Sequence, residues 1–183
     1  MAEQAENIRY ASIDLKVNGT GGLLVLSEQA PGITYWLTGQ KQVVVFKSGY
    51  LASTSGLKKD LITSEYDPPL AEFAAPAADN QAVMREASNR AHQLVRTWQT
   101  NNGGRRSSSG RATIKCESDT HLVALPLATL PLEKCRESVQ WRTGERTTSV
   151  YWRDPKTHRI WAAEVVAWPG GPTVAWDVAR PWW

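Results

Sequence analysis

No hydrophobic run in this chain of 183 residues approaches the ~20 apolar residues that a membrane-spanning helix needs. The net charge is only +3, whereas nucleic acid binding is typical of a concentrated basic face. Cysteine is also scarce: Cys116 and Cys135 lack CxxC spacing and have no histidine cluster near them. These absences argue against a membrane helix, a nucleic acid partner, a disulfide-rich scaffold and a metal site.

The common catalytic and nucleotide-binding motifs (GxSxG, HExxH, Walker and Rossmann) are missing as well. The least unsuitable carboxylate pair is Asp154 with Glu164, which flanks an aromatic hairpin. An aspartate that caps its own turn explains Asp154 more simply. We therefore predict that the protein is not an enzyme, with no catalytic residues and no cofactor.

The N-terminus carries no secretion signal, because residues 1–6 are polar and acidic and no apolar segment follows. Taken literally, this start indicates a soluble intracellular protein. A mature exported chain that begins with a new methionine is the alternative. The residues leave both possibilities open.

Tryptophan is abundant, with nine residues against two phenylalanines. Its large apolar ring and its N–H suit both half-buried sheet faces and platforms for sugars. Most of the nine must lie in the core, but terminal residues rarely order without a groove or partner. Trp182 and Trp183 therefore either plug one end of the sheet, the simpler interpretation, or form a ligand platform. The candidate ligand-binding residues are Trp176, Trp182, Trp183, Arg105 and Arg106.

Basic residues gather between positions 85 and 115. A solvated face plus a loop is the simpler interpretation, and an anion site is the alternative. The residues concerned are Arg85, Arg90, Arg96, Arg105, Arg106, Arg111 and Lys115.

Short apolar runs between glycine, asparagine and proline turns predict antiparallel strands. The predicted strands are 9–16, 23–26, 33–37, 42–46, 50–54, 93–98, 111–117, 121–124, 137–141, 149–153, 159–166 and 173–178. We also predict a helical turn over 57–61, a short helix over 81–87 and a flexible loop over 101–110. The expected fold is mainly β: one domain over 1–183, an antiparallel barrel or sandwich with a few short helices.

Two stretches together resemble the YjbF-type lipoproteins, which include the group 4 capsule lipoprotein GfcB. In the first stretch, a Gly-Leu step and an Asp-Leu step precede an Asp-Pro. In the second, Tyr-Trp-x-Asp is followed by a turn and a tryptophan. The matching residues are Gly56, Leu57, Asp60, Leu61, Asp67 and Pro68, then Tyr151, Trp152, Asp154 and Trp161. Two features depart from the family: His158 stands where a turn glycine is usual, and the lipobox cysteine is missing.

The resemblance implies a β-rich periplasmic lipoprotein of the outer membrane, encoded with exopolysaccharide or capsule secretion genes and without established catalysis. Its partners would be a polysaccharide, other secretion proteins or both, and its N-terminal lipid anchor would lie outside this sequence. From the residues alone, Cys116 and Cys135 are either two buried thiols or a disulfide; the periplasm implied by the resemblance favours the disulfide. The alternatives are a periplasmic glycan-acting enzyme and a protein-interaction module for an outer-membrane partner.

Overall fold

The computed structural model describes residue 6, residues 9–70 and residues 91–183. These residues form a sheet of twelve antiparallel strands, ordered β5-β4-β3-β2-β1-β12-β11-β10-β9-β8-β7-β6. The strands are β1 (Ser12–Val17), β2 (Thr20–Ala30), β3 (Ile33–Leu37), β4 (Val43–Lys47), β5 (Tyr50–Ser55), β6 (Leu61–Asp67), β7 (Ala91–Gln99), β8 (Arg105–Ala124), β9 (Thr129–Trp141), β10 (Arg146–Arg153), β11 (Ile160–Val166) and β12 (Thr173–Arg180). The prediction of a mainly β fold is confirmed.

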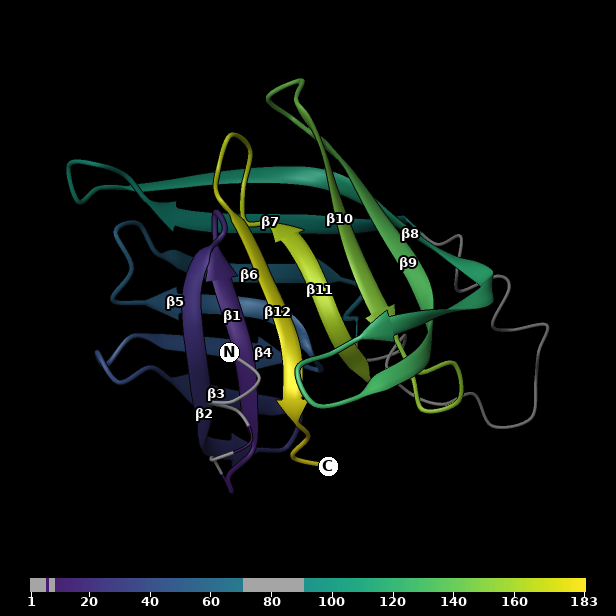
Figure 1. Ribbon diagram of the computed structural model, residues 1–183. Coiled ribbons are helices and arrows are strands. Elements are labelled where there is room, and N and C mark those ends of the chain that lie inside the picture. The colour runs from purple at the N-terminus through teal and green to yellow at the C-terminus, as the bar shows by residue number, and fades with distance from the viewer. Residues whose placement is uncertain (1–5, 7–8, 71–90) are drawn as a thin grey trace.

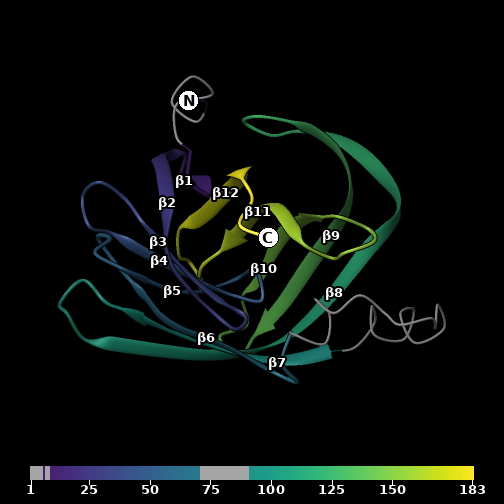
Figure 2. The same cartoon turned by 90° about the horizontal axis from the view of Figure 1, so that it is seen from below.

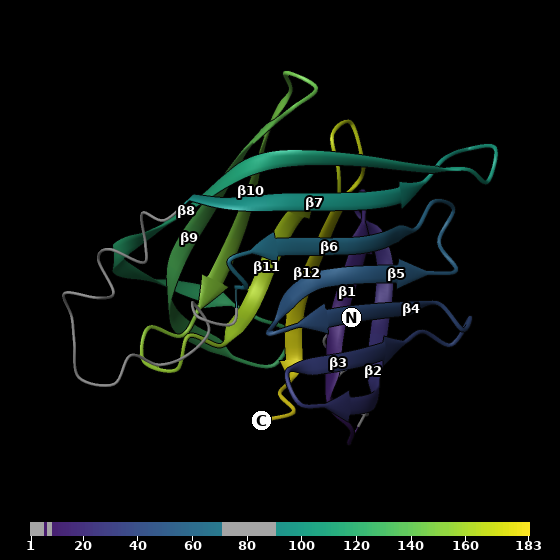
Figure 3. The same cartoon turned by 180° about the vertical axis from the view of Figure 1, so that it is seen from behind.

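The sheet curls until its two edge strands, β5 and β6, lie side by side (Figures 1 and 3). At one end of this seam, the backbone N–H of Leu61 donates to the side-chain Oγ1 of Thr54 at 2.9 Å. A side chain here takes the place of a backbone carbonyl as the acceptor. The result is a nearly closed barrel, which leaves little exposed strand edge.

Large aromatic side chains fill the barrel. Phe46 lies 4.7 Å from Trp176, and Tyr50 lies 5.1 Å from Tyr151, between ring centroids. Five of the nine tryptophans are buried: Trp36, Trp98, Trp141, Trp168 and Trp176. Alternation along the strands turns four of these rings inward, and the fifth, Trp168, lies in the β11–β12 turn and stacks on Trp98. The interior is therefore packed rather than open.

The predicted helical turn over 57–61 is wrong. The carboxylate of Asp60 accepts hydrogen bonds from the backbone N–H groups of Gly56 and Leu57, at 3.1 and 3.0 Å. This local bonding competes with a helix and instead makes a turn that leads into β6. The predicted short helix over 81–87 lies outside the described residues.

The predicted loop over 101–110 is also too long, because β8 already begins at Arg105. Gly110 explains the difference. A Cβ placed there would lie 2.7 Å from Cγ1 of Val139 and 2.9 Å from the carbonyl oxygen of Gln140. Glycine at this position therefore permits close packing of β8 on β9 rather than flexibility.

Cys116 in β8 lies directly opposite Cys135 in β9, and the two form a disulfide. The bridge sits at the irregularity in pairing between Cys116 and Thr120. It therefore ties the two long strands together where their ladder is interrupted.

In the described part of the chain, no helix has the length and hydrophobicity of a membrane span.

Candidate functional site

The aromatic hairpin is formed by β10 and β11, as the sequence predicts. Its turn is fixed by Asp154, whose carboxylate accepts from the backbone N–H groups of Lys156 and Thr157 at 2.9 and 2.7 Å. Burial would raise the pKa of Asp154, but the hydrogen bonds from Thr157 and Lys156 hold it below its usual value. Asp154 therefore caps the turn and stays ionised.

His158 occupies the turn position where a glycine is usual, and its φ of 57° lies in the left-handed region. Its N–H donates to the carbonyl of Asp154 at 2.9 Å, which closes the turn. The side chain of His158 is buried, whereas that of the next residue, Arg159, is exposed. The turn thus points Arg159 outward beside the C-terminal segment.

A cavity of about 220 Å³ lies at this end of the barrel, and we call it the tryptophan pocket. Three turns and the C-terminal segment line it: β2–β3, β4–β5 and β10–β11, followed by residues 182–183. Figure 2 shows the ribbon from below, with the C-terminus on the side of the viewer. Its polar and aromatic lining residues include two buried ones, Thr34 and His158, and five that keep exposed surface, Gln29, Ser48, Arg159, Trp182 and Trp183.

Trp182 and Trp183 are held in place by other rings. Trp182 lies 4.8 Å from Trp36 in an edge-on contact, and Trp183 lies 5.2 Å from Trp161. The guanidinium of Arg159 stands 5.3 Å from the centre of the Trp183 ring. Both terminal tryptophans are only half-buried, so the pair packs on the core and also keeps surface for a ligand.

The other candidate ligand residues lie elsewhere. Trp176 is 4% exposed and packs in the barrel interior, so its ring has no face for a ligand. Arg105 and Arg106 are exposed at the start of β8 and line a different cavity that shares no residue with the tryptophan pocket. The structure therefore brings together only Trp182 and Trp183 of the five.

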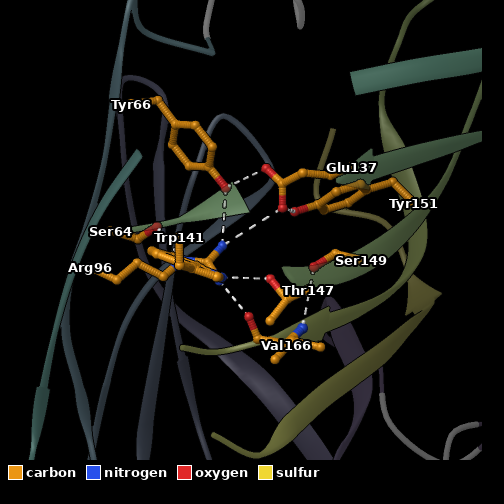
Figure 4. Close-up of polar contacts among 9 residues, drawn as sticks. All are labelled: Ser64, Tyr66, Arg96, Glu137, Trp141, Thr147, Ser149, Tyr151 and Val166. Carbon is orange, nitrogen blue, oxygen red and sulfur yellow. Dashed lines mark hydrogen bonds and ion pairs between the residues drawn. The ribbon is translucent and has the colours of Figure 1, made fainter. Parts of the chain in front are cut away.

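A polar cluster that the sequence did not predict lies inside the barrel (Figure 4). At its centre, Nη2 of Arg96 lies 3.9 Å from Oε2 of Glu137, and both side chains are at most 1% exposed. The hydroxyl of Tyr66 accepts from Arg96 at 3.1 Å and donates to Glu137 at 2.9 Å. Tyr151 donates to the other carboxylate oxygen at 3.5 Å. We call these residues the polar centre.

The polar centre also bonds the backbone where β10 and β11 separate. Arg96 donates to the carbonyl of Val166, the last residue of β11, and the N–H of Val166 donates to Oγ of Ser149 at 3.3 Å. On the opposite side, Nε of Arg96 donates to Ser64 at 3.1 Å. Side chains thus satisfy backbone groups that the strand ladder leaves unpaired, as buried polar groups require.

The charges of the polar centre are matched. Burial would lower the pKa of Arg96, but the facing Tyr66 and Glu137 hold it above its ordinary value. Burial, followed by the charge of Glu137, raises the pKa of both Tyr66 and Tyr151. The two phenols are therefore protonated donors at neutral pH, and the cluster is a satisfied structural network.

The interpretation of Arg96 as part of a solvated basic face is wrong. In the sequence, Leu94, Arg96 and Trp98 alternate on one face of β7, and all three are buried. This alternation was the available signal, since a residue between two inward positions of the same face must also point inward. Nothing in the sequence identifies Glu137 as its partner, because the two are brought together only by the barrel.

The candidate carboxylate pair is not brought together. Asp154 bonds through its N–H to the carbonyl of Arg159, and Glu164 lies five residues farther along β11. At ~3.3 Å per residue, the backbone positions of the two residues lie roughly 16 Å apart along the hairpin. Glycosidase pairs lie about 5 to 9.5 Å apart.

Among the described residues, the group nearest to a metal cluster is Cys116, Glu133 and Cys135, but the disulfide removes its thiolates.

These features define a β-barrel protein with a packed interior, a buried polar centre and a half-open aromatic pocket at one end. The chain belongs to the family described as group 4 capsule polysaccharide lipoprotein GfcB, YjbF, whose model matches residues 1–178. The predicted family resemblance is confirmed. Membership links the chain to capsule or exopolysaccharide and, because the family is one of lipoproteins, to the cell envelope.

The fold is similar to the crystal structure of the hypothetical lipoprotein YmcC from Escherichia coli, with a TM-score of 0.82. The two are 17% identical, and the match covers 98% of this chain and 88% of the other. At this identity, the likeness concerns the fold alone. No curated protein sequence matches the chain.

Proposed function

We propose that this protein is a non-enzymatic accessory of capsule or exopolysaccharide secretion, and that it binds a glycan chain in the tryptophan pocket. The observation that carries the proposal is the half-buried pair of Trp182 and Trp183, with Arg159 beside it. Membership of a capsule polysaccharide family supplies the class of ligand.

The pocket has the chemistry that sugars need. An indole ring can stack on the apolar face of a sugar ring, and nearby polar groups can then bond to its hydroxyls. Gln29 and Ser48 on neighbouring turns offer such groups, and Arg159 offers a charged donor. Because Trp36 and Trp161 hold the two terminal rings, little freedom is lost on binding, which favours affinity.

A role without catalysis fits the placement of the acidic groups. Glu137 is buried and satisfied by Arg96 and two phenols, while Asp154 is committed to its turn. Glu164 is exposed on β11, remote from Asp154. A glycan bound at Trp183 would therefore not meet Asp154 and Glu164 as a pair at a working separation.

For localisation, we propose the periplasmic side of the outer membrane, with a lipid anchor on the N-terminal side of the chain. The Cys116–Cys135 disulfide supports this placement, since such bridges persist in oxidising compartments. Fractionation of cells that carry the complete gene, with globomycin to block lipoprotein processing, tests it. Protein that stays in the cytosol with reduced thiols would contradict it.

Isothermal titration with oligosaccharides cut from the capsule of the source strain tests the function. We expect Trp182→Ala with Trp183→Ala to weaken binding at least about tenfold, since each stacked ring contributes roughly 1 to 3 kcal/mol. The matched control is Trp152→Ala, because Trp152 is also half-buried but does not line the pocket. Equal losses in both variants, or cleavage of the oligosaccharide by the wild type, would contradict the proposal.

A further inference from the structure

The end of the barrel opposite the tryptophan pocket carries four basic residues on two adjoining turns: Lys58, Arg105 and Arg106 are exposed, and Lys59 is half-buried. The β5–β6 and β7–β8 turns lie side by side (Figures 1 and 3), and the N–H of Gln99 donates to the carbonyl of Asp60 at 2.9 Å. Lys58 and Lys59 line a cavity of about 480 Å³ there.

A neighbouring cavity of about 600 Å³ is lined by Arg105 and Arg106, and both cavities include Asn101. The four side chains Lys58, Lys59, Arg105 and Arg106 therefore border one continuous surface, which we call the basic rim. Among the residues that the structure describes, no acidic one lines either cavity.

The acidic residues on nearby turns are already engaged. Asp60 accepts from the N–H groups of its own turn, and Glu145 accepts from the N–H of Gly170 at 2.8 Å. Within the described residues, no carboxylate forms an ion pair with any member of the basic rim. The carboxylates of Asp60 and Glu145 keep their charge, but the four cations of the basic rim outnumber the two of them, so the rim keeps a net positive charge for an external anion.

We propose that the basic rim binds an acidic polysaccharide, such as a chain of uronic acid residues. This inference rests on the proposed function, because it takes the ligand to be a glycan. It adds that the glycan is anionic and that a second contact lies at the opposite end of the barrel from Trp182 and Trp183. Several separated cations fit a linear polyanion better than a single small anion.

An anionic membrane is the other surface that a basic rim attracts, but the path of the chain favours the glycan. β1 begins at Ser12, at the far end, and runs toward Asn18, which lines the same cavity as Lys58. A lipid anchor on the N-terminal side of Ser12 would therefore hold the far end of the barrel near the bilayer. The basic rim would face away from that membrane.

Fluorescence anisotropy with labelled oligogalacturonate tests the inference on the full chain. We expect binding that weakens as salt is raised, because released counterions drive it. Lys58→Glu with Lys59→Glu, and Arg105→Glu with Arg106→Glu, should each weaken binding about tenfold or more at low salt. The matched control is Arg111→Glu with Lys115→Glu, since both residues are exposed on β8 but lie outside the rim. This control should remain within about twofold, as expected for charges outside the contact.

Melting curves that match the wild type identify variants that fold. Loss of equal size in the control variant, or no loss in either rim variant, would overturn the inference. So would binding to vesicles rich in phosphatidylglycerol, abolished by the rim variants, without binding to oligogalacturonate. Failure of the proposed function is distinguishable: Trp182→Ala with Trp183→Ala would then leave binding of capsule oligosaccharides unchanged, whatever the rim variants do.

Discussion

The polar centre and the tryptophan pocket both set a guanidinium against an indole ring, but in opposite surroundings. Arg96 lies 5.9 Å from the ring of Trp141 and is 1% exposed, and its donors are directed to Glu137, Tyr66, Ser64 and Val166. Arg159 lies 5.3 Å from the ring of Trp183 and is exposed.

The difference lies in what remains for a ligand. The buried arginine uses its hydrogen-bonding capacity to hold β7, β9 and β11 together, so removing it harms the fold. The exposed arginine keeps donors that a bound sugar can use, so removing it harms binding. The same pair of residue types is thus structural in one place and available for recognition in the other.

The largest expected effect comes from Arg96→Met. Removing the cation leaves Glu137 buried and uncompensated, and breaking such a buried pair costs roughly 3 to 5 kcal/mol of unfolding free energy. Arg159→Met, the same substitution at the exposed site, should change it by less than about 0.5 kcal/mol. Urea denaturation of both variants measures the difference. Equal stabilities of the two variants would contradict the structural role of Arg96.

The second effect concerns binding. Arg159→Ala should weaken the affinity for capsule oligosaccharides about fivefold, since an exposed cation–π contact contributes ~0.5–1 kcal/mol and a hydrogen bond is lost as well. Lys156→Ala is the control, because Lys156 is exposed on the same turn but does not line the pocket. Titration calorimetry checks both. A larger loss from Lys156→Ala would show that net charge, rather than the pocket, controls binding.

A smaller effect is expected on the pH dependence of stability, at Asp177. Burial, opposed by Lys16 and reinforced by Asp14 and Glu164, raises the pKa of Asp177. A carboxyl with a raised folded pKa contributes stability at low pH, and this contribution is lost as pH rises from the unfolded pKa through the folded value. Asp177→Asn should therefore make the protein slightly more stable at neutral pH and remove that part of the pH dependence. Melting temperatures between acidic and neutral pH test this, and a less stable variant at neutral pH would contradict it.

Asp154 should show the opposite sign and the smallest effect. Its lowered pKa means that its contribution is present above the unfolded pKa and is lost as pH falls through the folded value. Asp154→Asn should lower the melting temperature slightly at neutral pH and leave glycan binding intact. Loss of function without loss of stability would instead support an enzyme that uses this carboxylate.

Much of the fold could be predicted because the strands carry local signals. The Asp154 turn, the alternation of buried residues and the inward aromatic rings all follow from neighbouring residues. The two errors have different causes. At 57–61, the carboxylate of Asp60 accepts from the N–H groups of its own turn, a local alternative that competes with a helix. At 101–110, Gly110 reflects the close approach of β9, which short-range patterns do not show.

In the candidate site too, some residues could be predicted from the sequence, whereas their surroundings depend on contacts distant in sequence. The terminal position and residue type of Trp182 and Trp183 identified them as ligand candidates, and their pocket was not predictable because three turns distant in sequence complete it. Trp176 and Trp182 are alike as residues, yet one faces inward and the other lies beyond the last strand. Arg96 and Glu137 are 41 positions apart and stand on β7 and β9, the two neighbours of β8, so no local pattern predicts their pairing.

The most direct test of glycan binding in the tryptophan pocket follows the indole N–H signals of the tryptophans by NMR while capsule oligosaccharides are added. We expect the signals of Trp182 and Trp183 to shift. The signal of Trp141, which donates to Thr147 at 2.8 Å inside the barrel, should stay fixed. Assignment comes from single substitutions of each tryptophan by phenylalanine. Saturating ligand that shifts neither terminal signal, or that shifts the Trp141 signal instead, would contradict glycan binding in the tryptophan pocket.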